Sequence, residues 1–167
     1  GRLDRFGGAG IYAIYYRGVF DAYAELIRHV DIETPLYVGK AVPTGARKGG
    51  ADQSSFDGPA LYKRINQHSK SIAAAENLEL AHFWCRYLIV EDIWIPLGES
   101  LLISRFMPVW NTLVDGFGNH DPGRGRYKGM RSRWDTLHPG REWAARCEPR
   151  PESPAQIKAE LLNFQGN

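Results

Sequence analysis

The chain has 167 residues, a formal charge of +2 at pH 7 and two cysteines. This length suits one domain with its own core, and no apolar run approaches the roughly 20 residues that span a bilayer. Cys85 and Cys147 lack the spacing of a zinc site, so we expect free thiols in a cytoplasmic protein. The net charge is too small to indicate a nucleic-acid partner, so the placement of the charges matters more.

The first third of the chain predicts two strands, a helix and a long loop. Residues 10–17 and 36–40 are rich in aromatic and β-branched side chains, which favour strands. Between them, residues 21–29 have apolar positions at helical spacing after a capping aspartate. Residues 43–59 are rich in Gly, Ser, Asp and Lys, which predicts an exposed loop of a length that usually serves a function.

The next part of the chain predicts a helix, a buried strand and another helix. Residues 60–75 have apolar side chains along one helical face. Residues 82–90 form an apolar run that indicates a buried strand. A further helix is expected over roughly residues 99–106, and Pro108 would end it.

The chain changes character near residue 116. Residues 116–150 are polar, glycine-rich and basic, and a short helix is expected over residues 155–164. We therefore interpret residues 1–167 as one domain with a core at 10–111 and a basic extension at 116–167. Aromatic side chains alternate with the basic ones of the extension, which are Arg124, Arg126, Lys128, Arg131, Arg133, Arg141 and Arg146.

Two tripeptides place a tyrosine beside a glycine on the predicted strands. They are Gly10-Ile11-Tyr12 and Tyr37-Val38-Gly39. Strand tyrosines commonly bury their rings and keep the hydroxyl at the rim, which needs no further function. A free phenol has a pKa of about 10 and is a poor base, so a tyrosine would take a proton from water only beside a cation such as Lys40.

Arg64 and His68 are four residues apart on the predicted 60–75 helix, so their side chains leave the same face. A guanidinium can bind a phosphate through two parallel hydrogen bonds. An imidazole can hold or transfer a proton near neutral pH. A solvated helix face would explain the same spacing without any function.

Glu99 and Asn111 are the polar candidates further along the chain. Glu99 stands at the predicted start of its helix, where the macrodipole favours an anion. A functional carboxylate there would hold one hard cation such as Mg²⁺, whereas a structural one would only complement the dipole. Asn111 follows a predicted helix end, where it would either form a local turn or brace a catalytic loop.

Taken together, these residues resemble the GIY-YIG nuclease family. The elements follow the order of that family between residues 10 and 111. They are the first tripeptide, YVG in place of YIG, an Arg-x-x-x-His helix, and a glutamate followed twelve positions later by asparagine. Each element alone is a weak signal, but the ordered set would require several independent coincidences.

The resemblance implies a fold and a reaction. The fold would be α/β (α+β), with an antiparallel sheet of about three strands flanked by helices. The reaction would be single-metal hydrolysis of DNA phosphodiester bonds, with Glu99 as the ligand of Mg²⁺ and with Mn²⁺ able to substitute.

The resemblance also implies roles for the other site residues. Arg64 would contact the scissile phosphate, and Asn111 would order the site. Tyr12 or Tyr37 would activate the attacking water, and of these we prefer Tyr12. His68 would assist the proton transfer.

The chain departs from the family pattern in two places. A predicted helix separates the two tripeptides, which the family usually joins by a tight turn. The usual spacing of the family arginine points to Arg47, inside the 43–59 loop, but we prefer Arg64 because His68 follows one helical turn later. The loop is then an insertion, and its Arg47 and Lys48 become candidate contacts to the DNA backbone. Such insertions, with no large appended domain, are most similar to the type II restriction endonuclease branch.

The basic extension predicts how DNA would be recognised. Arginine binds phosphates and also reads guanine in the major groove, and the bias toward arginine favours base reading over a merely solvated tail. We therefore predict cutting of double-stranded DNA at a GC-rich palindrome by a homodimer. No protein partner would be required, and the location would be the prokaryotic cytoplasm. The candidate DNA contacts are Lys40, Arg47, Lys48, Arg124, Arg126, Lys128, Arg131 and Arg133.

Two alternative functions are a homing or DNA-repair nuclease fragment and a DNA-binding module that has lost catalysis. The presence of every expected polar site residue argues against the inactive module. Asn119-His120-Asp121 is a weak candidate for a second metal site, and its glycine-rich context favours a turn instead.

Overall fold

The computed structural model describes residues 3–23, 34–43, 58–123 and 125–164. Most of the predicted 43–59 loop therefore lies outside the described residues, and so do Arg47, Lys48 and Arg124. Of the predicted 21–29 helix, residues 21–23 are described and are helical.

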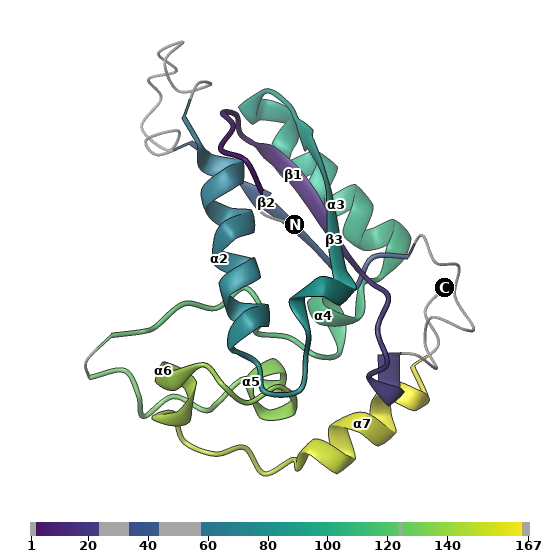
Figure 1. Ribbon diagram of the computed structural model, residues 1–167, viewed down its shortest axis with the longest axis vertical. Helices are drawn as coiled ribbons and strands as arrows, with labels where there is room; N and C mark the ends of the chain where they lie inside the picture. Colours follow the sequence, from purple (N-terminus) through teal and green to yellow (C-terminus); the bar gives the residue numbers. More distant parts are fainter. Residues whose placement is uncertain (1–2, 24–33, 44–57, 124, 165–167) are drawn as a thin grey trace.

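A small antiparallel sheet forms the centre of the protein (Figure 1). Its strands are β1 (Gly10–Tyr16), β2 (Tyr37–Ala41) and β3 (Phe83–Ile89), in the order β2-β1-β3. Both neighbours of β1 run antiparallel to it. The predicted sheet of about three strands flanked by helices is confirmed.

The two faces of the sheet are covered by different helices, α2 (Ala60–Ala74) and α3 (Ile95–Phe106) (Figure 1). Successive strand residues point to opposite faces. Tyr12 accordingly packs in a cluster with Leu61 and other residues of α2, whereas Ala13 packs in a cluster with Leu102 of α3. Strand β1 is buried along its whole length because it has a strand on each side and a helix on each face.

The glycine of the first tripeptide allows a close approach between strands. Gly10 has a φ of +154° and lies opposite Ile89 of β3. A Cβ atom there would lie 2.0 Å from the carbonyl oxygen of Leu88. Any larger residue would push β3 away from β1, so this glycine serves the pairing of the strands.

The prediction that residues 82–90 form a buried strand is wrong in one respect. The strand exists as β3, but its second half is exposed, and Leu88 retains 58% of its accessible surface. The reason is its position, because β3 is an edge strand and only β1 lies beside it. An apolar run shows strand character but cannot show how many neighbours the strand has.

Helix α3 begins earlier than predicted. A short 3-10 turn at Asp92–Trp94 leads into Ile95, and Pro96 falls in the first turn, where proline is tolerated. Glu99 is therefore in the second turn rather than at the helix start. The predicted support of its charge by the helix terminus is wrong. Met107, with a left-handed φ of 42°, ends the helix before Pro108.

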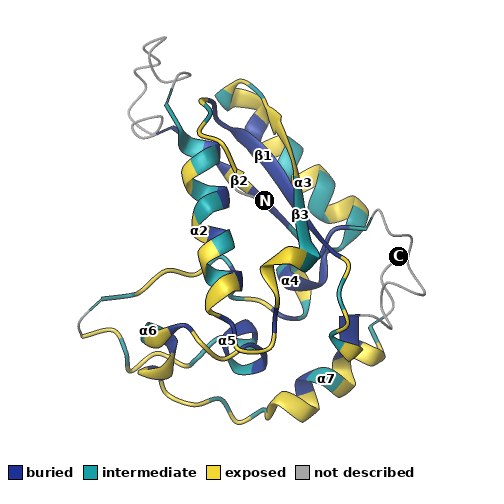
Figure 2. Ribbon diagram, in the orientation of Figure 1, coloured by how far each residue is buried: buried dark blue, intermediate teal, exposed yellow. Residues whose placement is uncertain are grey.

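The C-terminal part folds back onto the main core (Figure 2). Its last helix, α7 (Pro154–Leu162), starts with a capping box and agrees with the predicted 155–164 helix within two residues. Trp134 and Ile157 are fully buried in the same cluster as the α2 face of the sheet. None of the described helices is long and apolar enough to cross a membrane. The helices that follow α3 are α4 (Val109–Thr112), α5 (Arg133–Leu137), α6 (Glu142–Ala145) and α7 (Pro154–Leu162).

A buried polar network joins this C-terminal part to the core. The Tyr23 hydroxyl lies 2.6 Å from Nε2 of His138 and accepts a hydrogen bond from the Trp110 indole nitrogen at 2.7 Å. Nδ1 of His138 lies 2.8 Å from the side-chain oxygen of Asn77. Burial lowers the pKa of His138 to about 3, so this imidazole is neutral in the folded protein at pH 7.

The protein should lose stability as the pH falls from about 6.5 toward 3. An unfolded histidine titrates near 6.5, so across this window the unfolded chain binds a proton that folded His138 does not. The expected contribution is about 1.4 kcal/mol per pH unit. Urea unfolding at several pH values should show that His138→Gln, although less stable, loses free energy less steeply by about this amount. Equal slopes in the two proteins would contradict the assignment.

Candidate active site

Four of the residues predicted to form the site converge on the α2 face of the sheet. Tyr12 comes from the central strand β1 and Tyr37 from the start of the edge strand β2, and their rings lie 6.2 Å apart. Arg64 and His68 stand one turn apart on α2, with the His68 ring 5.2 Å from that of Tyr37. The spacing that suggested a common helix face therefore places both side chains against the tyrosines.

Tyr12 and His68 form a buried hydrogen-bonded pair. The Tyr12 hydroxyl lies 2.6 Å from Nε2 of His68, and the two residues are 1% and 2% exposed. Burial raises the pKa of Tyr12 and lowers that of His68 to about 3, with nearby Arg64 lowering the latter further. Both groups are therefore neutral at pH 7. Lys40, which the sequence suggested as a cation beside a phenolate, is not among the groups that shift the pKa of Tyr12.

Arg64 is held by a segment that follows α4. Its Nη2 donates to the carbonyl oxygen of Gly118 at 3.0 Å. Its Nη1 contacts Nε2 of His120 and donates to the Gln67 side chain at 3.3 Å. Sequence reasoning missed the contacts of Arg64 with Gly118 and His120, because a backbone carbonyl has no sequence signature and His120 lies 56 residues from Arg64.

Of the Asn119-His120-Asp121 segment, Asp121 makes a local turn contact with the residues that follow it. The Asp121 carboxylate accepts a hydrogen bond from the Gly123 backbone at 2.8 Å. Among the residues that the structure describes, there is no group of three His, Cys, Asp or Glu side chains placed to hold a metal. The imidazole of His120 instead faces Arg64.

Phe117 supports the imidazole of His68. Its ring stacks on His68 with centroids 4.4 Å apart, and it meets Tyr37 edge-on at 5.0 Å. Phe117 is itself 1% exposed. The segment after α4 thus contributes both an aromatic floor and a carbonyl acceptor to the cluster of predicted site residues.

Glu99 lies on the other side of β2, where it pairs with Lys40. The Lys40 ammonium lies 2.6 Å from the Glu99 carboxylate, and the side chains are 42% and 18% exposed. Glu99 is close enough to raise the pKa of Tyr37, in addition to the larger effect of burial. A single, partly exposed carboxylate already beside a positive charge fits Mg²⁺, which keeps several waters and uses few protein ligands.

Asn111 braces β2 from behind the site. Its side-chain oxygen accepts from the Val38 backbone nitrogen, and its amide nitrogen donates to the Val38 carbonyl oxygen, both at 2.8 Å. The sequence left open whether Asn111 forms a local turn or a contact across the fold, and in the structure its side chain makes the contact across the fold. The residue lies within α4 rather than after a helix end, which corrects its predicted position.

The predicted DNA contacts of the basic extension are not equally available. Arg126 and Lys128 are exposed. Arg131 instead donates to the backbone carbonyl oxygens of Ala144 and Ala145. Arg133 is mostly buried and pairs with two glutamates of the C-terminal segment. Composition alone could not distinguish these internal bonds from surface charges.

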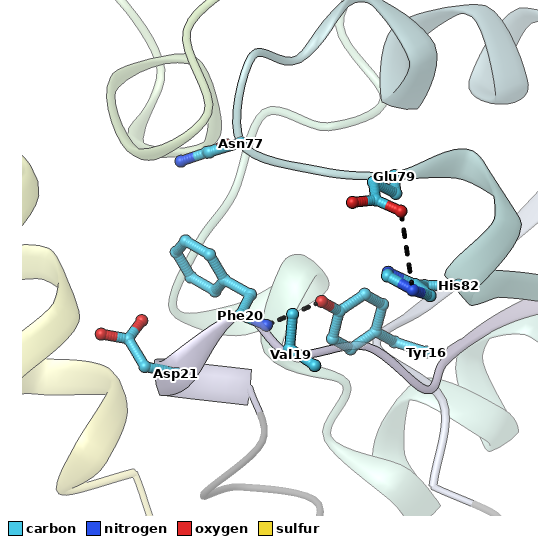
Figure 3. Close-up of a pocket in the computed structure, with 7 residues that line it drawn as sticks. All are labelled: Tyr16, Val19, Phe20, Asp21, Asn77, Glu79 and His82. Carbon is cyan, nitrogen blue, oxygen red and sulfur yellow. Dashed lines mark hydrogen bonds and ion pairs between the residues drawn. The ribbon is translucent and has the colours of Figure 1, made fainter.

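Figure 3 shows a pocket in the protein. Tyr16, Phe20 and Asn77 are among the side chains that line it, with the His82–Glu79 ion pair at one side. None of the predicted catalytic residues lines this pocket.

The three-stranded antiparallel sheet with flanking helices and a tyrosine tripeptide on each of β1 and β2 is typical of the GIY-YIG class of proteins. The model of one restriction endonuclease-type family, the Eco29kI GIY-YIG domain, matches residues 4–165. The chain belongs to that family, and the predicted family membership is confirmed.

The chain is also similar to a curated protein of Paramagnetospirillum magneticum (strain ATCC 700264 / AMB-1) named orotidine 5'-phosphate decarboxylase. The two are 29% identical over 157 residues, which cover 93% of this chain and 61% of that protein. The chain thus spans about three fifths of the length of this relative.

Replacement of Gly39 by alanine should disturb the tyrosines directly. A Cβ atom there would lie 2.5 Å from the Tyr12 hydroxyl and 2.8 Å from the Tyr37 ring. We expect Gly39→Ala to lower the free energy of unfolding by about 1–3 kcal/mol through overpacking, as measured by urea denaturation. Gly129→Ala is the matched control, because its Cβ would meet its nearest atom at 3.4 Å. Equal stabilities of the two variants would refute this explanation of the glycine.

Proposed function

We propose that this protein is a type II restriction endonuclease that makes Mg²⁺-dependent, sequence-specific double-strand cuts in DNA. The observation that carries the proposal is the convergence of Arg64 and the Tyr12–His68 pair beside Tyr37, on the module that the family match covers. A guanidinium and a buried neutral proton-transfer pair are the groups that phosphodiester hydrolysis needs.

Arg64 binds the scissile phosphate in this proposal. Its Nη1 now contacts His120 and Gln67, so the phosphate replaces these neutral partners with a charged acceptor. Charge-assisted hydrogen bonds are about twice as strong as neutral ones, which favours the exchange. The bond from Nη2 to Gly118 is kept and holds the guanidinium in place.

Tyr12 and His68 accept the proton of the attacking water. The water donates to the Tyr12 oxygen while Tyr12 passes its own proton to Nε2 of His68, so no free phenolate has to form in a buried site. Arg64 lowers the pKa of His68 in the free protein. A phosphate bound to Arg64 offsets that charge and raises the proton affinity of His68 when substrate is present.

Glu99 holds Mg²⁺ in this proposal, and Mn²⁺ can substitute. Glu99 would hold the cation through the carboxylate that now pairs with Lys40, since Mg²⁺ needs few protein ligands. What Mg²⁺ supplies there is positive charge next to the phosphate oxygens. Lys40, once released from Glu99, becomes a DNA-backbone contact.

Recognition of sequence falls to the residues outside the catalytic cluster. We propose a GC-rich palindrome cut by a homodimer, because two active sites related by a two-fold axis cut both strands of a palindrome. The exposed Arg126 and Lys128 are the described candidates of the basic extension. The protein would need no further protein partner or membrane, and it would act in the prokaryotic cytoplasm.

Glu99→Gln should abolish Mg²⁺-dependent nicking of plasmid DNA, with a loss of at least about 100-fold, because an amide cannot neutralise a divalent cation. The Tyr12–His68 pair lies on the opposite face of the sheet and should be undisturbed. Glu76→Gln, which removes an exposed carboxylate, is the control and should cut normally. Full nicking activity of Glu99→Gln with Mg²⁺ would show that the metal ligand is elsewhere.

Cleavage of a random DNA library, followed by mapping of the ends, should yield one GC-rich palindromic sequence with symmetric cuts. Arginine contacts to guanine are the physical reason for the expected base preference. A consensus of A and T bases alone would contradict the proposed GC-rich recognition site. Cutting only at lesions or branched junctions would favour a repair nuclease, and binding without cutting would favour an inactive DNA-binding module.

A further inference from the structure

Arg141 belongs to the basic extension by sequence, yet it is buried and fully hydrogen-bonded. Its side chain is 4% exposed. Nε and Nη2 donate to the two carboxylate oxygens of Asp135 at 2.6 and 2.7 Å. The remaining donors reach the backbone carbonyl oxygens of Gly116, Phe117 and Asn119 at 3.0–3.1 Å. All five N–H donors of the guanidinium are therefore used.

The Arg141–Asp135 pair is itself held rigidly. The Arg141 guanidinium lies over the rings of Trp134 and Trp143, at 4.5 and 4.7 Å from their centroids. The Ser132 hydroxyl donates to the Asp135 carboxylate at 2.7 Å. A buried ion pair with every donor satisfied and two aromatic faces beside it can adopt few other arrangements.

The three carbonyls that Arg141 holds lie in the segment that forms one wall of the candidate active site. Between them, the Gly118 carbonyl oxygen points to Nη2 of Arg64 at 3.0 Å. Phe117, whose carbonyl Arg141 binds, stacks its ring on His68. One buried arginine thus fixes the backbone on both sides of the carbonyl that orients another arginine.

We propose that Arg141 is a positioning residue for Arg64, acting through the backbone of residues 116–119. The clamp sets the direction of the Gly118 carbonyl and so the plane in which the Arg64 guanidinium meets a phosphate. The proposal rests on the proposed function of Arg64. It makes part of the basic extension a component of the active site rather than a DNA-contacting arm.

Arg141→Lys tests the clamp, because an ammonium has three donors and cannot reproduce the planar five-donor contact. Under steady-state cleavage with Mg²⁺, kcat should fall about 100-fold, as expected for a small misplacement of a reacting group. The KM for DNA should change less than about threefold, since no phosphate contact is removed. An unchanged kcat would overturn the proposal.

Combination with Arg64→Lys separates positioning from a general loss of stability. If Arg141 acts through Arg64, adding Arg141→Lys to Arg64→Lys should cost less than about threefold more. Fully multiplicative losses would show that Arg141 does not act through Arg64. Arg150→Lys is the matched control, because the Arg150 guanidinium likewise binds a carboxylate and the backbone, but through Glu152 and the Arg131 carbonyl oxygen, away from residues 116–119. It should keep kcat, and a loss equal to that of Arg141→Lys would contradict the proposal.

If Arg141→Lys does not fold, Gly118→Ala tests whether kcat depends on the position of the backbone beside Arg64. Its Cβ atom would lie 2.8 Å from the Tyr37 hydroxyl and 3.3 Å from Nη2 of Arg64, without touching the buried ion pair. We expect a loss of kcat that again does not multiply with Arg64→Lys. Wild-type kcat in Gly118→Ala would overturn the inference.

NMR spectroscopy of the free protein can test the Arg141 clamp independently of DNA cleavage. Because Phe117 stacks on His68, movement of the 116–119 backbone should shift the NMR signals of the His68 ring protons in the free protein. Arg141→Lys should shift them and Arg150→Lys should not. If the wild-type protein fails to cut DNA, the nuclease proposal falls, and these shifts still decide whether the clamp exists. Unmoved His68 signals in Arg141→Lys would refute the clamp.

Discussion

The burial of β1 on both faces is the constraint on which the rest of the structure depends. Because the strand has a helix on each face and a strand on each edge, its alternating side chains must enter two separate cores. Tyr12 points toward α2 and meets His68 and the segment after α4. Its neighbours point toward α3, the helix that carries Glu99. A three-stranded sheet is narrow enough for groups on both faces to approach the same edge strand, β2.

Burial also determines the protonation of the site. Tyr12 and His68 stay neutral because charging either one would leave an ion with little solvation. Arg64 is the cation whose field reaches both. A phosphate that neutralises Arg64 would therefore change the proton affinity of the pair at the moment of binding. In the proposed mechanism, substrate binding and activation of the proton acceptor would be one electrostatic event.

Sequence predicted the parts of this structure that depend on local pattern. The strands that carry the tyrosines follow from β propensity. The common helix face of Arg64 and His68 and the C-terminal helix follow from helical periodicity. It failed where the outcome depends on neighbours distant in the chain. The exposure of β3 follows from its edge position, and α3 starts early because a short turn at Asp92–Trp94 leads into it. The hydrogen bond from Arg64 to the Gly118 carbonyl oxygen could not be predicted from sequence, since every residue has a backbone carbonyl.

The basic extension shows why charge content is a weak guide to DNA contact. Arginine has two uses with opposite consequences, because a guanidinium that binds carbonyl or carboxylate oxygens within the protein is no longer available to a phosphate. Arg131, Arg133 and Arg141 have the first use in this structure. Hydrogen bonds and ion pairs of this kind hold the short helices of the extension in a fixed position against the rest of the protein. In the proposed nuclease, Arg141 would act through the geometry of residues 116–119, and DNA recognition would rely on fewer basic side chains than the composition implies.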